Sequence, residues 1–482
     1  MLKIITTLAE AFGARHKQLY MVGGTVRDVM LHRGQSNDAD LATDARPDEI
    51  KQIVAPTQPN AVVLVGERFG TVRLHYGSDI VEITTFRSET YNPDSRKPEV
   101  CFGNDLIEDL HRRDFTINAM ARQPLTDQII DPFGGKQDLE AQLLRAVGDE
   151  PEKRFAEDPL RMLRAVRFAA QLKFDIESGT THSILQQAGT LQKISRERIR
   201  DEMNKLLLSD HPALGLDLLV ELGLMRWIIP EVMELKGVGQ QAQRGGHSKD
   251  VYAHVLRVVE RSSPELHARW SALLHDIAKP RTRSVEDGNI VHFFGHEEIG
   301  AQMARDILKR LHFDRDLIES VSCTVRLHMR ANAYTPDWTD GAVRRLMLDS
   351  GESLPHLLDL SRADITSYRT DKILRAEARV SELMIRCQQL KEQAERVPLK
   401  SPLDGDELMK LFDRKPGPWL RPLKEHLLGL VIDGVLSPDD KEEAARIARE
   451  FLSADMPTAP SRESAVGISG DEISLSTKET PL

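Results

Sequence analysis

The chain has 482 residues, of which 40% are hydrophobic and 29% charged, and its formal net charge is −10 at pH 7. This composition is that of an ordinary soluble globular protein, and the length predicts about two to four domains. The acidic excess argues against a general nucleic-acid binder, and no apolar run approaches the length of about 18 residues that a membrane span needs.

The N-terminal segment and the cysteines bear on the cellular compartment. Residues 1–20 have an amphipathic helical pattern without a long apolar stretch and cleavage site, so we expect no secretory signal. Cys101, Cys323 and Cys387 are odd in number and far apart, which argues against a disulfide framework. We therefore expect a cytoplasmic protein with no membrane partner.

The first 145 residues combine short apolar runs with turn residues. The segments LYMVGG, AVVLVG, TVRLHYG and DIVEITTF end in glycine or polar residues, as sheet strands do. After about residue 150, long stretches of helical period follow, such as PLRMLRAVRFAAQL and EEIGAQMARDILKRL. The expected fold class is α+β, with a small α/β head of mixed sheet and helices and an all-α remainder.

Changes in composition predict the domain boundaries. The Gly- and Gln-rich segment 237–250 and the Pro-containing segment 392–404 interrupt helical patterns. Residues 456–482 lack aromatic residues and are rich in Ser, Thr, Pro, Gly and acidic residues, so we expect disorder there. The expected parts are a head (1–145), a helical neck (146–240), a second helical domain (241–392), a C-terminal helical segment (393–455) and the tail (456–482).

Two glycines and two aspartates in the head suggest nucleotidyl-transfer chemistry. Gly23 and Gly24 follow a strand-like segment, where backbone N–H groups approach an anion closely. Asp38 and Asp40 follow 14 residues later, and on a strand over 37–42 their side chains project from one face. A phosphate-binding turn facing two carboxylates suits Mg²⁺-dependent phosphoryl or nucleotidyl transfer. Either pair alone is also typical of turns and helix N-caps.

Further polar residues in the head extend this pattern. Glu82 alternates in a strand-like segment and is either a third carboxylate of the site or a charged residue on a solvated strand face. Arg112 and Arg113 could neutralise a triphosphate, and Asp114 and Asn118 are neighbours if this segment is helical. Aspartate can bind a ribose hydroxyl, but a surface ion-pair cluster is the alternative.

The neck carries a basic strip. Pro159 is a favoured first helical position, and Asp158 and Arg161 are three residues apart, so we expect them to share a helix face. Residues 153–205 hold 11 Lys and Arg against 7 Asp and Glu. The candidates for contacts with RNA phosphates are Arg164, Arg167, Arg196 and Arg198.

Six motifs occur in order between about residues 18 and 235. They are GGTVRD, NDADLAT, RRDFTINAMA, DPFGGKQDLE, EDPLRMLRAVRFAA and RERIRDEMNKLL. Together they resemble the motifs of the class II tRNA nucleotidyltransferases, CCA-adding enzymes of the DNA polymerase β superfamily that also include bacterial poly(A) polymerases. The resemblance implies addition of CCA to tRNA 3′ ends from CTP and ATP with Mg²⁺, with the tRNA acceptor end recognised by shape and backbone contact. An A-adding enzyme or a poly(A) polymerase shares every catalytic motif and stays an alternative.

The resemblance also implies residue roles. Asp38 and Asp40 would be the metal-binding catalytic carboxylates, with Glu82 as the third. The nucleotide-binding residues would be Gly23, Gly24, Arg27 with its neighbour Asp28, Arg113, Asp114, Asn118, Asp158, Arg161 and Arg164. Of these, Asp158 and Arg161 would read the incoming base. The polar segment 87–100 falls where the family keeps a flexible loop for switching from C to A addition, which disfavours a CC-only enzyme.

The helical half contains a second pattern of histidines and aspartates. Its members are His254, His275, Asp276, His296, His328 and Asp364. Imidazoles and carboxylates suit divalent transition metals, although scattered histidines are often surface or core residues. The order resembles the HD phosphohydrolase superfamily, which implies one metal on the first three and Asp364, and a second completed by His296 and His328. His247 and His292 are spare candidates.

The HD resemblance implies a divalent metal (Ni, Mn, Fe or Mg) and hydrolysis of phosphomonoesters or 2′,3′-cyclic phosphates. Alternatives of another class are an HD phosphohydrolase whose head mainly binds RNA and a non-catalytic RNA-binding scaffold. The segment 401–428 resembles the C-terminal segment of such enzymes, and we expect helices there that contact tRNA or the body. The sequence does not indicate an oligomeric state.

Overall fold

The computed structural model describes residues 1–33, 37–65, 70–90, 99–239, 250–286, 290–365, 370–396 and 400–454. Two compact units are formed, one by Met1–Pro336 with Leu346–Met384 and the other by Asp337–Arg345 with Ile385–Leu482. The expected disordered tail, the candidate His247 and most of the expected flexible loop (91–98) lie outside the described residues.

The head is built on a mixed sheet with the strand order β3-β4-β5-β2-β1-β8-β9. Its strands are β1 (Leu19–Val22), β2 (Asp38–Thr43), β3 (Ala61–Val65), β4 (Thr71–Tyr76), β5 (Asp79–Thr85), β8 (Ala121–Arg122) and β9 (Ile129–Ile130). β2 and β5 pair in parallel, whereas β1 pairs with β2 and β4 with β5 in the antiparallel sense. The predicted mixed sheet is therefore confirmed. A separate hairpin is formed by β6 (Arg87–Thr90) and β7 (Glu99–Phe102).

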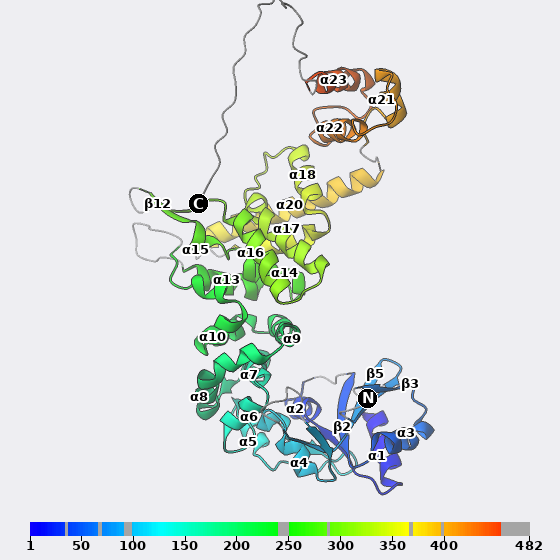
Figure 1. Ribbon diagram of the computed structural model, residues 1–482, viewed down its shortest axis with the longest axis vertical. Helices are drawn as coiled ribbons and strands as arrows, with labels where there is room; N and C mark the ends of the chain where they lie inside the picture. The colour runs from blue at the N-terminus through cyan, green and yellow to red at the C-terminus, as the bar shows by residue number, and fades with distance from the viewer. Residues whose placement is uncertain are drawn as a thin grey trace, which may run out of the picture. The chain divides into compact units, whose positions relative to one another are not determined.

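The head also contains helices, some of which pack on this sheet. They are α1 (Leu2–Gly13), α2 (Gly24–Met30), α3 (Pro47–Val54), α4 (Leu106–His111) and α5 (Gly135–Glu140), with 3-10 turns η1 (Ala55–Thr57) and η3 (Thr116–Asn118). The amphipathic pattern of the first segment forms α1, whose Leu8 and Phe12 are buried. α1 and α3 pack on each other and on the sheet (Figure 1).

Beyond residue 150 the first unit is mainly helical, as expected. Its helices are α6 (Pro151–Glu157), α7 (Leu160–Leu172), α8 (Ser178–Gln187), α9 (Arg196–Leu207), α10 (Pro212–Glu221), α11 (Met225–Ile228), α12 (Pro230–Glu234), α13 (Val251–Arg261), α14 (Leu266–Leu274), α15 (Lys279–Thr282), α16 (His296–Arg310), α17 (Arg315–Asn332) and α19 (Leu354–Ala363), with 3-10 turns η4 (Ala188–Lys193) and η5 (Gly351–Ser353). α18 (Asp340–Ser350) and α20 (Thr370–Arg396) contribute residues to both units.

Two small sheets depart from the expected all-α remainder. β10 (Leu143–Leu144) pairs in parallel with β11 (Asp175–Ile176), and β12 (Arg283–Glu286) forms a hairpin with β13 (Ile290–Phe293). Strands this short leave no alternating pattern long enough to be detected in a sequence.

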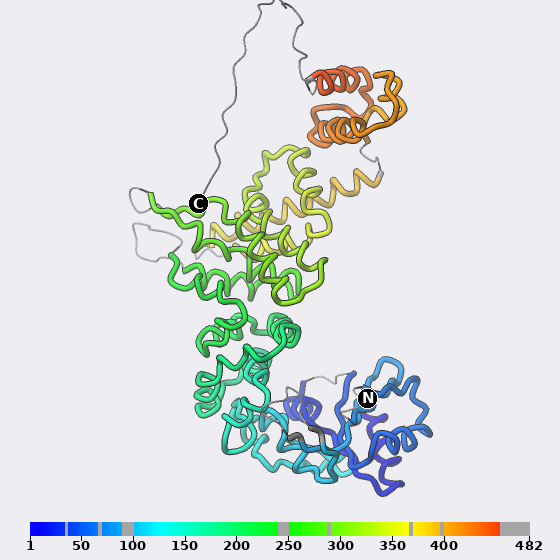
Figure 2. The backbone as a smooth tube through the Cα atoms, viewed as in Figure 1, coloured from blue at the N-terminus to red at the C-terminus, as the bar shows by residue number. Residues whose placement is uncertain are grey.

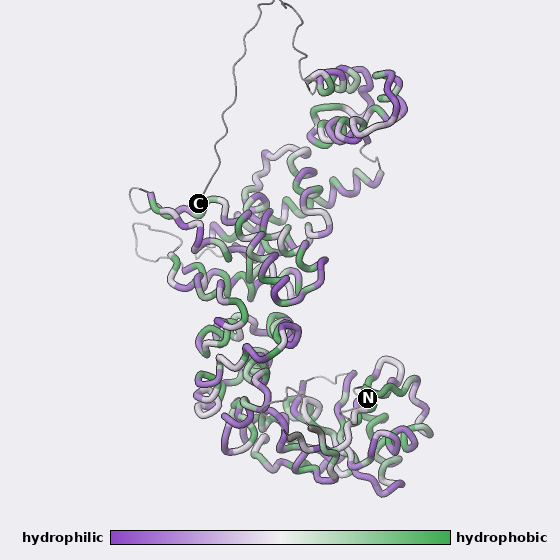
Figure 3. Tube along the Cα trace, viewed as in Figure 1, coloured by the Kyte–Doolittle hydropathy of each residue, from purple (hydrophilic) through white to green (hydrophobic). Residues whose placement is uncertain are grey.

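Amphipathic helices build the body of the first unit. α16 packs along α17, and the buried residues of the two helices include Ala304, Ile307, Val321 and Val325. Figure 2 follows the chain through these helices, and Figure 3 shows hydrophobic and hydrophilic residues alternating along them. Among the described residues, none of the helices combines the length and the apolarity that a membrane crossing requires.

The second unit contains three helices that follow α20: α21 (Gly405–Phe412), α22 (Leu420–Ile432) and α23 (Lys441–Ala454). Their core contains Leu408, Leu423 and Leu427. α21 begins with a capping box in which Asp404 and Glu407 bond each other's backbone. The predicted helices in 401–428 are thus confirmed, while their contact with tRNA or the body stays a prediction.

Candidate active site and a second candidate metal centre

Three carboxylates lie on two neighbouring parallel strands of the head. β2 carries Asp38 and Asp40, and β5 carries Glu82 opposite Asp40. The two aspartates project from one face because Ala39 between them points into the core, where it is 3% exposed. Arg73 orients Glu82, its Nε donating a hydrogen bond to Oε1 at 2.8 Å. The predicted strand with both aspartates on one face is confirmed.

The electrostatics of Asp40 favour a bound cation. Burial raises the pKa of Asp40, and Glu82 and Asp38 raise it further, while Arg113 and Arg27 oppose this rise. Carboxylates gathered at one place repel each other until a cation balances them. Their oxygen atoms are the ligands that Mg²⁺ prefers, so these residues fit the metal that the chemistry requires.

Gly23 and Gly24 lie at the start of α2 beside the carboxylates. Gly23 has a φ of +65°, and a Cβ there would lie 2.9 Å from an Arg113 guanidinium nitrogen, so the position requires glycine. The Asp40 backbone N–H donates to Thr25 Oγ1 at 2.9 Å, which ties β2 to α2. The glycine turn and the strand that carries the two aspartates are therefore held together directly.

A buried carboxylate orients two arginines. Asp109 accepts hydrogen bonds from Arg112 at 2.7 Å and from Arg113 at 3.1 Å. Burial would raise the pKa of Asp109, but Arg113 and Arg112 lower it below its usual value. Arg27 is likewise fixed, donating to Asn118 Oδ1 at 2.8 Å and to both carboxylate oxygens of Asp28.

Asp114 joins the head to the neck. Asn118 Nδ2 donates to its Oδ1 at 3.1 Å, and Arg164 Nε donates to its Oδ2 at 2.7 Å. Asp114 and Asn118 are thus neighbours as predicted, although a 3-10 turn, η3, brings them together rather than an α-helix. Burial would raise the pKa of Asp114, but Arg164 and Asn118 lower it to about 2.

We expect Asp114→Asn to lower the free energy of unfolding of the head by about 2 kcal/mol at pH 7. The pKa falls from 3.8 to about 2 on folding, and each pH unit corresponds to about 1.4 kcal/mol. A lowered carboxyl pKa stabilises the folded state above pH 3.8, and this stabilisation is lost as the pH falls toward 2. Urea titrations at several pH values should show the deficit shrinking on acidification.

The control for this measurement is Asp127→Asn, because Asp127 is 70% exposed and pairs only at the surface with Arg122. Its free energy of unfolding should stay close to that of the parent chain. An Asp114→Asn deficit that is equally large at acidic and neutral pH would show that the Asp114–Arg164 charge pair is not its source.

Asp158 and Arg161 do not share a helix face. Asp158 follows α6 in extended backbone, and α7 begins only at Leu160. Its Oδ2 accepts from Arg198 at 2.8 Å, whereas Arg161 donates to Glu157 Oε2 at 2.6 Å. The prediction that Asp158 belongs to the same helix as Arg161 was wrong, because the chain is extended at Asp158 and α7 begins after it.

The four candidate RNA-binding arginines differ in their surroundings. Arg167 is 7% exposed and donates to Glu202 Oε2 at 2.6 Å, so it lies in the interior. Arg196 donates to the Trp227 carbonyl at 3.0 Å. Arg164 is bonded to Asp114, as described above, and Arg198 to Asp158.

One cavity of about 500 Å³ collects most of these residues. The predicted site residues that line it are Gly23, Gly24, Arg27, Asp40, Arg113, Asp114, Asn118, Asp158, Arg161, Arg164 and Arg198. Residues that the sequence reasoning did not assign also line it, among them Thr84, Arg87 and Phe168. Arg198 was expected to contact RNA, yet it lines this cavity because α9 packs on α7.

The six HD residues form two overlapping groups. One group is His254, His275 and Asp276, the other is Asp276, His296 and His328, and the ligand atoms within each lie within 4.8 Å of one another. Asp364 joins the first group, with its Oδ1 3.0 Å from His254 Nε2. The structure therefore brings together all the residues that the HD resemblance selected.

Three of these histidines use Nδ1 for a contact with a backbone carbonyl. The Nδ1 atoms of His275, His296 and His328 lie 2.8, 2.7 and 2.6 Å from the carbonyls of Ala272, Phe293 and Val325. A proton on each Nδ1 leaves each Nε2 with a lone pair, as in many metal sites. Yet the Nε2 atoms lie in pairs only 3.3 Å apart, for His254 with His275 and for His296 with His328.

Two further observations fit a metal there. The buried Asp276 Oδ1 has no hydrogen-bond partner in the described structure, and burial lowers the pKa of His328 to about 4, which keeps it neutral at pH 7. Paired lone pairs and an unpartnered carboxylate oxygen suit divalent metals. The spare candidate His292 lies outside both groups, pairing with Glu286 and stacking on Phe294.

The fold and the first site define a metal-dependent nucleotidyltransferase with an added HD-type centre. The family models that match are "Poly A polymerase head domain" at residues 19–145, "Probable RNA and SrmB- binding site of polymerase A" at 173–235 and "HD domain" at 244–369. The CCA-adding enzyme of Geobacillus sp. (strain WCH70) is 30% identical over 422 residues, which are 86% of this chain and 89% of that protein. The chain belongs to the CCA-adding enzyme family.

Other comparisons agree with this assignment. The CCA-adding enzyme of Anoxybacillus flavithermus is 32% identical over 88% of this chain and 90% of its own length. That of Lactobacillus helveticus is 49% identical, but this chain spans only 47% of its length in the match. The solved structure of the Bacillus stearothermophilus CCA-adding enzyme in complex with CTP superposes with a TM-score of 0.66 at 25% identity, covering 94% of this chain and 97% of that one.

Proposed function

We propose that this chain adds C, C and A to the 3′ end of tRNA from CTP and ATP, without a nucleic-acid template. One observation carries the proposal: Asp40 of the carboxylate cluster and the base-reading candidates Asp158 and Arg161 line the same cavity. The CCA-adding enzymes named above support it. The cytoplasmic location expected from the cysteines is part of the proposal, and Cys101, Cys323 and Cys387 are all free.

Different residues would bind the metal and the triphosphate during the transfer. Asp38 and Asp40, with Glu82 beside them, would hold Mg²⁺, which supplies activation of the tRNA 3′-hydroxyl and stabilisation of the α-phosphate when bound. Arg113 and the turn at Gly23 lie where they would bind the triphosphate. The 3′ oxygen forms a bond to the α-phosphorus, and pyrophosphate leaves with the electrons of the broken bond.

Asp158 and Arg161 together would select the base. Cytosine and adenine both present an exocyclic amino donor next to a ring-nitrogen acceptor. Aspartate only accepts and arginine only donates hydrogen bonds, so the pair fits both bases. Uracil and guanine present a carbonyl in place of the amino group and a ring N–H in place of the acceptor. The aspartate would then face another acceptor and the arginine another donor, so neither hydrogen bond would form.

We expect Asp158→Asn to relax the discrimination between CTP and UTP by about 10- to 100-fold, because a mispaired buried hydrogen bond costs about 1–3 kcal/mol. An asparagine amide can turn its donor toward the uracil carbonyl, which a carboxylate cannot do. The measurement is kcat/KM for each nucleotide on a tRNA that lacks CCA.

Arg198→Ala is the matched variant, since it removes the ion-pair partner of Asp158 and keeps the carboxylate. Its affinity for nucleotides should fall while its preference for CTP over UTP persists. Unchanged discrimination in Asp158→Asn would remove Asp158 from base selection.

An A-adding enzyme and a poly(A) polymerase remain the alternatives within this chemistry. tRNA transcripts that end at the discriminator base, at C or at CC separate the three activities. An A-adding enzyme extends only the last transcript, and a poly(A) polymerase adds a run of A to any of them. Incorporation of CTP supports the proposal.

A second function, phosphohydrolysis at the HD centre, is favoured by the close Nε2 pairs and the unpartnered Asp276 Oδ1. We propose that the centre holds a divalent metal (Ni, Mn, Fe or Mg) that supports hydrolysis of phosphomonoesters or 2′,3′-cyclic phosphates. Such a reaction would repair damaged tRNA 3′ ends. Two alternatives are an HD phosphohydrolase whose head only binds RNA and a non-catalytic scaffold. Neither alternative gives the carboxylates on β2 a role.

A further inference from the structure

A second cavity of about 500 Å³ lies beside the HD centre. Its walls come from the C-terminal end of α17, the residues that end α19 and the first part of α20. All of its lining residues belong to the first unit. Its size falls within the range of about 300–1,000 Å³ that is typical of small-molecule sites. Apart from Asp364, no motif in the sequence pointed to this cavity.

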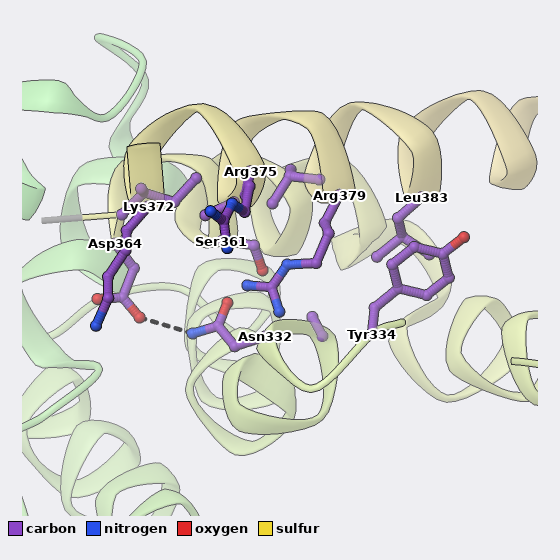
Figure 4. A pocket seen from close by; sticks show the side chains of 12 residues that line it. Asn332, Tyr334, Ser361, Asp364, Lys372, Arg375, Arg379 and Leu383 are labelled. Atoms are coloured by element: carbon purple, nitrogen blue, oxygen red, sulfur yellow. Dashed lines mark hydrogen bonds between the residues drawn. The ribbon is translucent and has the colours of Figure 1, made fainter. Parts of the chain in front are cut away.

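Asp364 connects this cavity to the HD centre. Its Oδ1 lies 3.0 Å from His254 Nε2, and its Oδ2 accepts a hydrogen bond from Asn332 Nδ2 at 2.7 Å. Asp364 and Asn332 both line the cavity, and Figure 4 shows Asn332 turned toward the carboxylate. A molecule bound in the cavity therefore lies next to the candidate metal ligands.

Three cations from α20 line the cavity. Lys372 and Arg379 are seven residues apart, close to two helical turns, so they share one face, and Arg375 lies between them (Figure 4). Asp371 lies 3.7 Å from Arg375. Within the described part of the chain, neither Lys372 nor Arg379 has an ion-pair partner. Cations without partners around a cavity attract phosphate.

Ser361 provides an independent indication of a ligand. Its side chain is 2% exposed, it lines the cavity, and its Oγ has no hydrogen-bond partner in the described structure. A buried hydroxyl without a partner is unusual and is satisfied when a ligand supplies one. At the end of the cavity away from Asp364, Tyr334 and Leu383 form an apolar wall (Figure 4).

We propose that this cavity is the substrate pocket of the HD centre and takes a ribonucleotide with a phosphate on its 2′ or 3′ oxygen. The phosphate lies at the Asp364 end of the cavity and is bound by Lys372 and Arg379, Ser361 bonds a sugar hydroxyl, and the base packs on Tyr334 and Leu383. The proposal rests on the hydrolytic function proposed for the HD centre. A free nucleotide and the terminal nucleotide of an RNA share this chemistry.

Titration calorimetry of the full chain with adenosine 3′-monophosphate in EDTA measures the pocket without turnover. Arg379→Ala and Lys372→Ala should each raise Kd about tenfold, the loss of one charge-assisted contact to phosphate, and Arg379→Lys should recover most of the affinity. Lys391→Ala, an exposed cation on the same helix, is the control and should leave Kd unchanged. Lys372 and Arg379 are both exposed, so folding should be preserved in the variants, and melting temperatures check this.

Failure of the pocket and failure of the HD function give different results. The first test is hydrolysis of adenosine 3′-monophosphate with Ni²⁺ or Mn²⁺. If the parent chain hydrolyses it and both alanine variants have the same KM as the parent, the cavity is not the substrate pocket, but the HD function stands. Binding that depends on Arg379 and Lys372 without hydrolysis by any metal supports the pocket and removes the HD function. An oligoribonucleotide with a 3′-phosphate that binds at least about tenfold more tightly than the mononucleotide identifies an RNA end as the source. Absence of binding by both probes overturns the proposal.

Discussion

Asp40→Asn should reduce the rate of CTP addition to tRNA by about 10³-fold or more, equivalent to about 4 kcal/mol of transition-state stabilisation. Asp40 lines the candidate nucleotide cavity, and it is paired in register with Glu82 on the adjoining parallel strand. An amide keeps the size of the side chain but removes the charge that would hold Mg²⁺. Single-turnover addition of CTP, with enzyme in excess over tRNA, measures this step directly.

Asp48→Asn is the matched control, because Asp48 is 88% exposed and forms an ion pair with the surface residue Lys51. It should add CTP at the rate of the parent chain. In Asp40→Asn, the affinity for tRNA should change little, since Asp40 is not a phosphate-binding cation. Nucleotide addition that survives in Asp40→Asn would make the assignment of the catalytic carboxylates wrong.

Asp276→Asn should abolish metal binding at the HD centre and lower phosphohydrolysis by about 10³-fold or more. Asp276 belongs to both ligand groups, so its loss affects both candidate metal positions at once. Metal analysis of the purified chain provides a readout that does not depend on activity. A chelator should lower the melting temperature of the parent chain but not that of the variant.

CTP addition by Asp276→Asn should stay within about twofold of the parent rate, because the carboxylates on β2 and the HD centre lie in different parts of the fold. Asp349→Asn, in a surface ion pair with Arg330, is the control for a lost aspartate in the same region. A parallel loss of both activities in Asp276→Asn would contradict two independent sites.

The arrangement of the two aspartates on β2 was predictable because it depends on local geometry alone. Alternation along one strand is enough to place Asp38 and Asp40 on the same face. Glu82 lies in an equally regular strand pattern, and only its register opposite Asp40 required the structure. The grouping of the HD residues was predicted only from the resemblance to the HD superfamily, because helical periodicity does not show that His254 and Asp364 lie close together.

The surroundings of residues that lie between packed helices could not be predicted from the sequence. Arg167 and Arg198 both lie in the basic strip, yet one is buried against Glu202 of α9 and the other reaches Asp158 in the nucleotide cavity. The two positions depend on how α7 packs on α9, which the period of neither helix determines. The β12–β13 hairpin was missed because its strands are too short to show alternation.

In the proposed function, one chain adds both C and A to tRNA. A tRNA transcript that ends at the discriminator base should be extended by two residues with CTP alone and by a third when ATP is also present, whereas ATP alone should not extend it. This result is predicted for the parent chain and should be lost in Asp40→Asn. Extension by ATP alone, or no incorporation of CTP at all, would show that this chain does not add CCA.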